Sequence, residues 1–348
     1  MRWPGVIAAY RDLLPALARV VTLGEGGTPL VPSPSLERRL GRPVWLKLEG
    51  CNPTGSFKDR GMTVAVSHAV DAGARGVVCA STGNTAASAA AYAARAALPC
   101  WIVLPAGAVA RGKLVQAAAH GARVIAVDAG FEAALALARA AASDRHVLVN
   151  SLNPMRLEGQ ATVAYELAEA LGRPPAVVVL PVGNGGNITA CWMGFRRWRE
   201  AGRSSALPRM IGVQAEGASP LVRGAPVERP QTVASAIRIG RPASWAGAVE
   251  AATASGGRFV AVSDDEILAA QRALAAEGVF VEPASAAAFA GAGRLDPTAL
   301  PDGDLVCVLT GHGLKDPDAV PPAAPERVAA TPEAVRALME GGGGARWP

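Results

Sequence analysis

Residues 76–104 read GVVCASTGNTAASAAAYAARAALPCWIVL, and this stretch decides the fold. Its two ends, 76–80 and 100–104, are short apolar runs rich in β-branched residues, which is typical of buried strands. The alanine-rich part between them, 86–97, has the spacing of a helix. A strand, a helix and a second strand in this order predict a parallel βαβ unit.

The same alternation continues along most of the chain. Helical spacing recurs at 113–120 and 132–142, between further short apolar runs. This pattern favours mostly parallel sheets with helices on both faces, which bind ligands at the carboxyl ends of their strands. The other runs that we interpret as buried strands are VWLKL (44–48), RVIAV (123–127), HVLVN (146–150), AVVVLPV (176–182), MIGVQ (210–214), RFVAV (258–262) and LVCVLT (305–310).

The length of 348 residues suits one large α/β domain or two smaller ones. We expect an α/β protein with two doubly wound open-sheet domains that face each other across a cleft. The smaller domain is placed at residues 54–150, and the larger one at residues 1–53 and 151–325. Prolines and a glycine run follow residue 320, so we expect residues 326–348 to form a C-terminal tail.

The composition excludes several classes of protein. A chain that is 50% hydrophobic and 18% charged does not have the composition of a disordered protein. No apolar run reaches the roughly 20 residues that span a membrane. The N-terminus lacks the features of a secretory signal, so we expect a cytoplasmic protein. Five scattered cysteines, with no C-x-x-C pair and no histidine at ligand spacing, argue against a disulfide framework and against a metal site.

The basic residues do not point to nucleic acid. The net charge is +5, but the arginines are spread along the chain. Their densest cluster, FRRWRE (195–200), is typical of the solvated face of a helix, and no groove-reading motif accompanies it. We therefore expect no nucleic-acid partner.

The first candidate for chemistry is LEGCNPTGSFKDRG (48–61), which follows a predicted strand and leads into a predicted helix. It does not match the phosphate-binding P-loop, so nucleotide hydrolysis loses its main support. Lys58, at the start of the helix, can be partly desolvated, which lowers the pKa of its amine and makes it a nucleophile that can form a Schiff base. The alternative is a surface ion pair between Lys58 and Asp59.

Two loops could bind anions at helix N-termini. The first, STGNT (81–85), presents backbone N–H groups and hydroxyls that suit a carboxylate or a phosphate, and an ordinary helix cap is an equally good interpretation. The second, GNGGN (183–187), lets the backbone approach an anion because its glycines lack Cβ atoms. It does not have the G-x-G-x-x-G spacing of dinucleotide folds, and turns use glycine routinely.

Eight motifs, taken together, carry a family resemblance. They are LGEGGTPL (23–30), GSFKDRG (55–61), STGNTAAS (81–88), VNSLNPMRLEGQ (149–160), PVGNGGNI (181–188), SAIRIGRPASW (235–245), EPASAA (282–287) and LTGHGLKDPD (309–318). The set resembles the pyridoxal-phosphate enzymes of fold type II, which have the tryptophan synthase beta-like fold, and most closely the threonine synthase family. The resemblance covers residues 10–318, which is nearly the whole chain.

The resemblance implies a pyridoxal 5′-phosphate cofactor in the cleft between the two domains. Lys58 is implied to bind it as a Schiff base, and Asn84 to donate a hydrogen bond to its 3′-oxygen. Thr310 is implied to lie beside the pyridine nitrogen, which a hydroxyl can hydrogen-bond. Gly185 stands where the family usually has alanine, and we expect the loss of a methyl group to be harmless. The residues implied to hold the cofactor's phosphate are Gly183, Asn184, Gly185, Gly186 and Asn187.

The resemblance also implies a substrate, O-phospho-L-homoserine, and a reaction. A carbon–oxygen lyase acting on phosphates would release phosphate by γ-elimination and add water at Cβ, giving L-threonine in the last step of threonine biosynthesis. The family further implies a homodimer. The apolar runs and the cysteine spacing give no reason to expect a membrane partner or a metal. The residues implied to bind the substrate are Ser81, Thr82 and Thr85 for its α-carboxylate, and Ser151, Asn153 and Arg156 for its phosphate.

Two alternatives remain open. Threonine or serine dehydratases and related β-replacement enzymes share the lysine and the glycine loop, but they do not all need a pocket for a γ-phosphate. A non-catalytic amino-acid binder of the same fold need not keep a nucleophilic amine. Only four of the 34 basic residues are lysines, and the one at position 58 could not be replaced by arginine, which cannot form a Schiff base.

Overall fold

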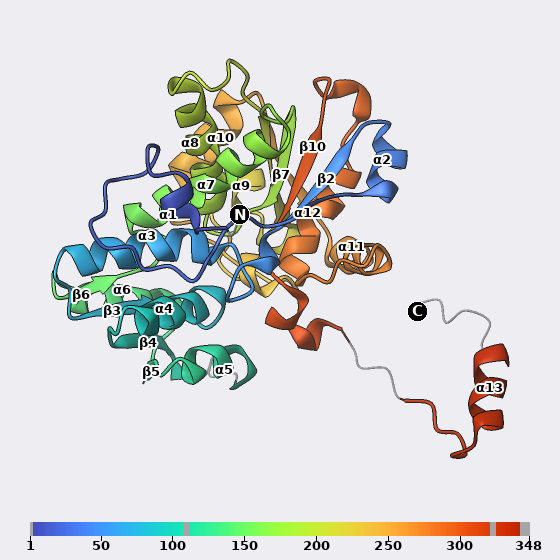
Figure 1. Ribbon diagram of the computed structural model, residues 1–348, viewed down its shortest axis with the longest axis horizontal. Helices are drawn as coiled ribbons and strands as arrows, with labels where there is room; N and C mark the ends of the chain where they lie inside the picture. The colour runs from blue at the N-terminus through green and yellow to red at the C-terminus, as the bar shows by residue number, and fades with distance from the viewer. Residues whose placement is uncertain (1–2, 107–110, 321–324, 342–348) are drawn as a thin grey trace.

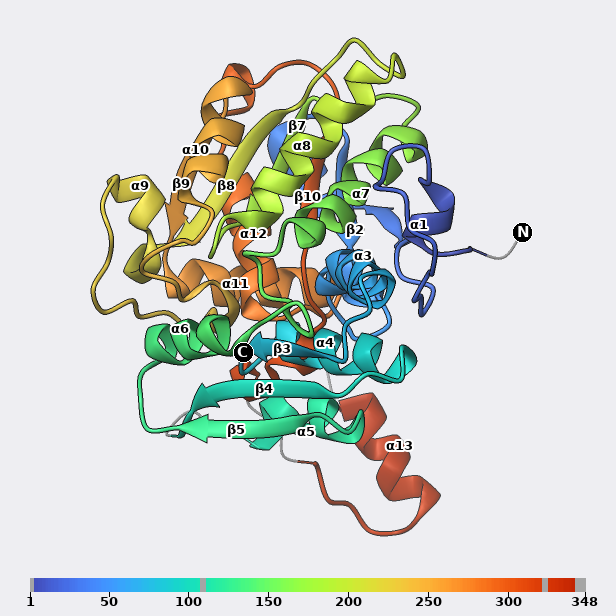
Figure 2. The same cartoon turned by 90° about the vertical axis from the view of Figure 1, so that its left-hand side faces the viewer.

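A computed structural model describes residues 3–106, 111–320 and 325–341 of the protein (Figure 1). The chain forms two separate sheets, one of six strands and one of four. The predicted fold class, α/β with doubly wound open sheets, is confirmed. Figure 2 shows the strands of the smaller sheet side by side in the lower part of the molecule, with the larger sheet above them.

The larger sheet has the strand order β1, β2, β10, β7, β8, β9. All its neighbouring strands run parallel except the edge pair β1 and β2, which is antiparallel. The three-residue strand β1 has no counterpart among the predicted strands. The bounds are β1 Leu30–Pro32, β2 Val44–Leu48, β7 Val177–Pro181, β8 Arg209–Ala215, β9 Arg258–Val262 and β10 Leu305–Leu309.

The smaller sheet has the strand order β5, β4, β3, β6, and all its strands are parallel. Its four strands come from one continuous part of the chain, within the segment 54–150 that we predicted to be the smaller domain. The boundaries of that domain stay a prediction. The bounds are β3 Gly76–Ala80, β4 Cys100–Pro105, β5 Arg123–Val127 and β6 His146–Leu148.

Each sheet is covered by helices on both faces. In the smaller sheet, Val77 and Cys79 of β3 pack with α3, α4 and α5, whereas Val78 and Ala80 pack with α6. In the larger sheet, Val178 and Leu180 of β7 belong to the core that contains α7, α8 and α10, and the alternate residues of β7 face α2, α11 and α12. Successive side chains of a strand point to opposite faces, so each strand contributes to two cores.

The helices connect the strands in the order that the sequence predicts. The short helices are α1 Val6–Ala9, α2 Pro34–Leu40 and α9 Pro220–Arg223. The longer ones are α3 Lys58–Asp71, α4 Asn84–Arg95, α5 Arg111–Ala119, α6 Phe131–Ala141, α7 Pro154–Ala170, α8 Gly186–Glu200, α10 Trp245–Ala254, α11 Asp264–Ala276, α12 Pro283–Gly293 and α13 Pro332–Gly341.

One predicted strand differs in its burial. Residues 123–127 form β5, as predicted, but four of its five residues are exposed rather than buried. The reason is its place at the edge of the sheet, where it pairs with β4 alone. A strand-like apolar run predicts the strand, but its position in the sheet decides how much of it is covered.

The C-terminal segment lies apart from the two sheets. Helix α13 stands away from the rest of the molecule in Figure 1. Residues 342–348, which belong to the predicted tail, lie outside the described part of the chain. Among the described residues, no helix has the length and apolar character that crossing a membrane requires.

Candidate active site

Lys58 is the first residue of α3, so it stands where the loop after β2 turns into a helix. Its amine lies 3.9 Å from the centre of the Phe57 ring. Burial, followed by the nearby charge of Arg156, lowers the pKa of this amine to about 7. A large share of the lysine is therefore a neutral amine at neutral pH, which is what a nucleophile requires.

The alternative ion pair with Asp59 is not what the structure favours. Asp59 is buried, and its carboxylate accepts hydrogen bonds from the backbone and hydroxyl of Thr54 and from the hydroxyl of Ser88, at 2.6–2.7 Å. Burial raises the pKa of Asp59 to about 6 in spite of these bonds. The Asp59 carboxylate therefore connects the loop that precedes α3 with helix α4. The amine of Lys58 stays available to the site.

The loop that carries Lys58 lies directly against the end of β10. The backbone N–H of Phe57 donates to the carbonyl oxygen of Thr310 at 3.0 Å, and Ser56 pairs with Gly311 in an antiparallel bridge. Thr310 itself is buried, and its hydroxyl lies 3.1 Å from the hydroxyl of Ser285. The structure therefore places the residue before Lys58 in contact with Thr310, although the two are far apart in the sequence.

The glycine loop precedes α8 and is tightly enclosed. Gly185 has a φ of +82° and caps the helix, and a Cβ there would lie 2.8 Å from the carbonyl oxygen of Ser244. A Cβ at Gly183 would lie 3.0 Å from Cα of Ile237. Glycine is therefore favoured at position 185 rather than merely tolerated, because its backbone takes a left-handed conformation that strains alanine.

This loop has donors for an anion. Helix α8 is 15 residues long, and the N–H groups of its first turn are directed out of its N-terminus. The side-chain nitrogen of Asn187 is buried and has no hydrogen-bond partner among the described residues. An unpaired buried donor beside a helix N-terminus suits a phosphate group, so the loop fits the phosphate of the implied cofactor.

The turn at the start of α4 holds Asn84 and the three residues predicted for the substrate carboxylate. Gly83 occupies the N-cap position and has no side chain to cap the helix. Ser81, Thr82 and Thr85 are partly exposed, and the Ser81 hydroxyl accepts the N–H of Gly83 at 3.2 Å. Of the two interpretations of this turn, the open helix N-terminus favours the anion site over the ordinary cap.

The three residues predicted for the substrate phosphate occupy different environments. Ser151 lies beside the glycine loop, since its Cβ is 3.9 Å from where a Cβ of Gly186 would be. Arg156 is 1% exposed, donates to the carbonyl oxygen of Val149 at 2.8 Å, and has a buried Nε without a partner among the described residues. Asn153 caps α7 by accepting the N–H of Met155 at 2.9 Å. Asn153 therefore has a structural role in addition to the predicted one.

The sequence patterns assigned no role to two polar residues near the site. Glu282 at the N-cap of α12 accepts the Asn84 amide with both of its oxygens, and Ser285 bonds to the backbone of Gly311. Both belong to the motif EPASAA (282–287), which contributed to the resemblance but received no role. An acidic residue before a proline and a run of alanines is the signal that could have drawn attention to it.

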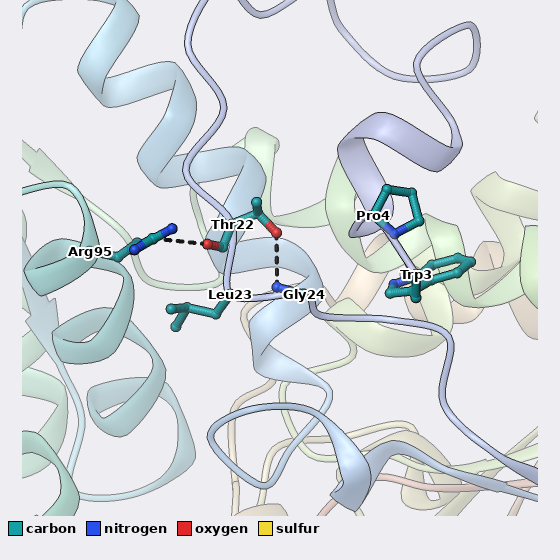
Figure 3. A pocket seen from close by; sticks show the side chains of 6 residues that line it. All are labelled: Trp3, Pro4, Thr22, Leu23, Gly24 and Arg95. Atoms are coloured by element: carbon teal, nitrogen blue, oxygen red, sulfur yellow. Dashed lines mark hydrogen bonds between the residues drawn. The ribbon is translucent and has the colours of Figure 1, made fainter. Parts of the chain in front are cut away.

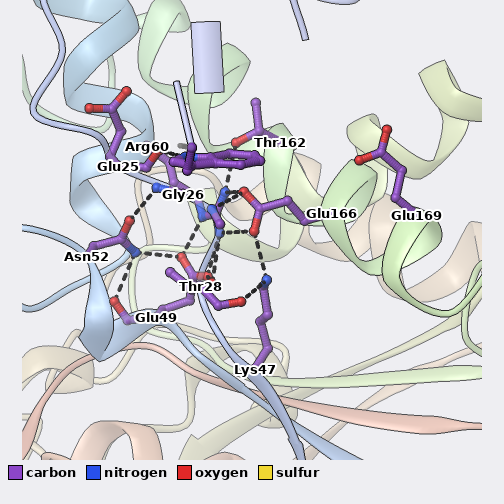
Figure 4. A network of polar contacts seen from close by, with 12 residues as sticks. Glu25, Gly26, Thr28, Lys47, Glu49, Asn52, Arg60, Thr162, Glu166 and Glu169 are labelled. Atoms are coloured by element: carbon purple, nitrogen blue, oxygen red, sulfur yellow. Dashed lines mark hydrogen bonds and ion pairs between the residues drawn. The ribbon is translucent and has the colours of Figure 1, made fainter. Parts of the chain in front are cut away.

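A buried ionic network adjoins the Lys58 helix. Figure 4 shows Arg60 of α3 between two glutamates, with Lys47 of β2 beside one of them. Arg60 donates to Glu49 at 2.6 and 2.7 Å and to Glu166 at 2.6 and 2.8 Å, and Lys47 donates to Glu166 at 2.7 Å. The charges of Arg60 and Lys47 hold the pKa of Glu166 at about 2 although burial opposes this. The network therefore joins β2, α3 and α7 behind the site.

A surface pocket of about 380 Å³ lies elsewhere. It contains none of the predicted site residues. Its walls come from the N-terminal segment and α4, and the guanidinium of Arg95 donates to the carbonyl oxygen of Thr22 at 3.2 Å across it (Figure 3). The residues that line it are Trp3, Pro4, Thr22, Leu23, Gly24 and Arg95.

Comparisons with known proteins identify the family. Residues 21–311 match the family described as pyridoxal-phosphate dependent enzyme. The threonine synthase of Mycobacterium leprae (strain TN) is 57% identical over 323 residues, which cover 91% of this chain and 90% of the relative. The threonine synthase of Synechocystis sp. is 53% identical, over 91% of this chain and 85% of the relative. The chain belongs to the threonine synthase family of pyridoxal-phosphate-dependent enzymes.

Solved structures of other enzymes share the fold. Maize serine racemase superposes with a TM-score of 0.73 at 22% identity, over 88% of this chain and 90% of that one. A fungal L-serine ammonia-lyase from Rhizomucor miehei has a TM-score of 0.71 at 26% identity, over 84% of this chain and 95% of that one. As a member of the threonine synthase family, the protein uses pyridoxal 5′-phosphate, and the predicted family, fold and cofactor are confirmed.

Proposed function

We propose that this protein converts O-phospho-L-homoserine and water to L-threonine and phosphate, the last step of threonine biosynthesis. The observation that carries the proposal is the proximity of Lys58 and Arg156. The buried guanidinium packs against α3 about one turn after Lys58, because its Nε lies 2.7 Å from where a Cβ of Gly61 would be, and its charge lowers the pKa of the amine. A nucleophilic amine and a cation that matches phosphate thus share one site. The relatives named threonine synthase support the same function.

The cofactor would be held by residues from both sheets. Lys58 would form the Schiff base, the N–H groups of residues 183–187 would bind the phosphate, and Asn84 would donate to the 3′-oxygen. The hydroxyl of Thr310, held by Ser285, would face the pyridine nitrogen. Bound pyridoxal phosphate supplies an electron sink for the negative charge that develops at the substrate's Cα. A hydroxyl partner leaves that sink weaker than a carboxylate partner would.

The substrate would bind with its two anionic ends in separate places. Its α-carboxylate would accept hydrogen bonds from the first turn of α4, around Ser81, Thr82 and Thr85. Its phosphate would meet Arg156 and Ser151, and the Asn153 amide, already bonded to Leu148 and Met155, would offer its remaining N–H. This arrangement holds the carbon chain between two fixed points and so orients Cα toward the Lys58 amine.

Lys58 would act as the base once the substrate is bound to the cofactor and the lysine amine is free. Its amine has a pKa of about 7, so it can accept the Cα proton at neutral pH and release it again. The same amine can then move the Cβ proton before the γ-phosphate leaves. Arg156 would stabilise the charge of the departing phosphate. Return of a proton to Cγ, which becomes the methyl group, addition of the hydroxyl of water at Cβ and return of a proton to Cα would complete the net reaction.

The proximity of Lys58 and Arg156 argues against a dehydratase. Removal of water from threonine or serine requires the amine but does not require a buried guanidinium next to it. A non-catalytic amino-acid binder needs neither the amine nor its lowered pKa. We therefore prefer the synthase.

The test is to give purified, pyridoxal-loaded protein O-phospho-L-homoserine and to measure inorganic phosphate together with the amino-acid product. We expect equal amounts of phosphate and threonine. Absence of phosphate release, with 2-oxobutyrate formed from added threonine, would make the protein a dehydratase. Absence of both products with a normal cofactor absorbance band would rule out both functions.

We also propose an oligomeric state, a location and domain boundaries for the protein. The protein would work as a homodimer, as the family implies, which light scattering on the purified protein would test. It would reside in the cytoplasm, which its five free thiols support, since that compartment keeps cysteines reduced. The chain would divide into domains at residues 54 and 151, which the separation of the strands into two sheets supports.

A further inference from the structure

Glu282 lies between the two halves of the site. It is 4% exposed and stands at the N-cap of α12, a helix that packs on the larger sheet. Both of its carboxylate oxygens lie 3.1 Å from the amide nitrogen of Asn84, which begins α4 on the smaller sheet. The contact therefore joins a helix of each sheet at the implied cofactor site.

The contact fixes which end of the Asn84 amide points where. An ionised carboxylate only accepts hydrogen bonds, so it selects the nitrogen end of an amide and turns the oxygen end away. Gly311 makes room for this carboxylate, because a Cβ at Gly311 would overlap it. The backbone N–H of Glu282 also donates to the carbonyl oxygen of Gly311 at 3.2 Å. The glutamate is thus anchored to the loop that follows Thr310.

Gly311 lies between Glu282 and the loop that leads into Lys58, since it pairs with Ser56 and accepts the N–H of Glu282, and several charged groups act on the Glu282 carboxylate. Lys58 comes from α3, Lys315 from the 3-10 turn after β10, and Asp316 from the residue that follows it. Burial raises the pKa of Glu282 to about 7, against the opposing effects of the Asn84 bond and the two lysines. In return, the negative charge of Glu282 opposes the lowering of the Lys58 pKa. The carboxylate and the amine titrate in the same range, so each affects the charge of the other.

We propose that Glu282 is a positioning residue of the site, which orients the Asn84 amide and supplies the negative charge that faces the Lys58 amine. The inference rests on the proposed function, because it takes Asn84 and Lys58 as the residues that bind the cofactor. Glu282 acts through these two residues and needs no contact of its own with substrate.

The test compares two substitutions of one residue in cofactor-free protein. Glu282→Gln keeps an oxygen that accepts from Asn84 and removes the charge, whereas Glu282→Ala removes both. Glu277→Gln is the matched control, since Glu277 is a partly buried glutamate directly after α11 that also accepts two hydrogen bonds, from Ser33 and Ser35. The readouts are the rate at which each protein recombines with pyridoxal phosphate between pH 6 and 9.5, and the dissociation constant of that complex.

Recombination requires the free amine of Lys58, so its pH profile reports the amine's charge. In Glu282→Gln we expect the midpoint to move to lower pH by about half a unit or more, because a charge that favours the protonated amine is gone. In Glu282→Ala we expect cofactor affinity to fall about tenfold, because the Asn84 amide loses a charge-assisted hydrogen bond. The cofactor affinity of Glu282→Gln should stay close to that of the wild type, because the glutamine oxygen still accepts from Asn84. Glu277→Gln should change neither quantity.

An unchanged midpoint in Glu282→Gln, or wild-type affinity in Glu282→Ala, would overturn the proposal. If Glu282 had only a structural role, both variants would lose cofactor affinity together and the pH midpoint would stay in place. That result would also contradict the proposal. The experiment uses only pyridoxal phosphate. A protein that shows these shifts but makes no threonine would disprove the proposed reaction, whereas the cofactor site, on which this inference rests, would stand.

Discussion

The hydroxyl of Ser88 on α4 donates a hydrogen bond of 2.6 Å to Asp59, the residue directly after Lys58. Both side chains are fully buried. The bond therefore connects the helix that begins with Lys58 to the helix that begins with Asn84, close to the start of each. The spacing of the two implied cofactor residues depends on this contact.

Replacing Ser88 by alanine should lower the free energy of unfolding by about 1–3 kcal/mol, because a buried carboxylate loses one of its donors. The pKa of Asp59 should rise further above about 6, since the Ser88 bond holds it down. Urea unfolding at pH 7 measures the first effect. Ser204→Ala, in the loop between α8 and β8, where the serine hydroxyl accepts an exposed hydrogen bond from the N–H of Ala206, should change stability by less than about 0.5 kcal/mol. Equal effects of the two substitutions would show that the buried bond contributes nothing.

Lys58→Ala should abolish both the visible absorbance band of the bound cofactor and the release of phosphate, because the variant lacks the amine to which the Schiff base is assigned. Lys58→Arg should fail in the same way, since a guanidinium keeps the charge but does not act as a nucleophile. Absorbance spectra and phosphate assays measure the two losses, and circular dichroism checks that both variants fold. Full activity in either variant would show that the site is assigned to the wrong lysine.

Arg156→Ala should lower kcat/KM for O-phospho-L-homoserine by about tenfold to a hundredfold, the range for losing a charge-assisted hydrogen bond to phosphate. Cofactor affinity should change much less. The midpoint of cofactor recombination should also move to higher pH, because the Arg156 charge lowers the pKa of Lys58. Arg196→Ala, on an exposed part of α8, is the control and should leave all three quantities unchanged. Equal losses of substrate and cofactor binding would indicate misfolding or a different phosphate site.

Local patterns in the sequence predict some features of the structure and not others. The apolar runs predict nine of the strands in the two sheets, because burial and β-branched side chains are local properties of a run. The place of Lys58 at a helix start and of residues 183–187 at the N-terminus of α8 also follows from local patterns. The exposure of β5 does not, since only the order of strands in the sheet decides it.

The charged residues of the interior mark the limit of local reasoning. Arg60, Glu49 and Glu166 would each be expected at the surface, and they are buried because segments far apart in the chain bring them together. Glu282 is hidden for the same reason, as its partner Asn84 is 198 residues away. Pairing of this kind depends on tertiary structure, which no periodicity reports.

Arg60→Met should destabilise the protein by about 3–5 kcal/mol, because Glu49 and Glu166 would be left buried without their shared cation. Arg203→Ala, which breaks an exposed ion pair with Asp12, should cost at most about 1 kcal/mol. Denaturant unfolding at pH 7 measures both changes. A loss for Arg60→Met no larger than that for Arg203→Ala would mean that the network carries little of the stability.

The cofactor-free protein should have a minimum of stability near pH 7. Glu282 has a pKa raised from 4.5 to about 7 on folding, so its folded form binds more protons in that window and stability falls as the pH rises through it. Lys58 has a pKa lowered from 10.5 to about 7, so the unfolded chain binds more protons above pH 7 and stability rises again toward pH 10.5.

Glu282→Gln should remove most of the acid side of this minimum. The variant should be more stable than the wild type above pH 7, by roughly 1–3 kcal/mol, and the difference should vanish as the pH falls well below 4.5, where the glutamate is protonated in both states. Thermal unfolding of both proteins from about pH 3.5 to about pH 10 measures it, with Glu277→Gln as the control. A wild-type curve without a minimum, or a variant that is less stable above pH 7, would mean that the buried carboxylate is stabilised by its lysine neighbours by more than its burial costs.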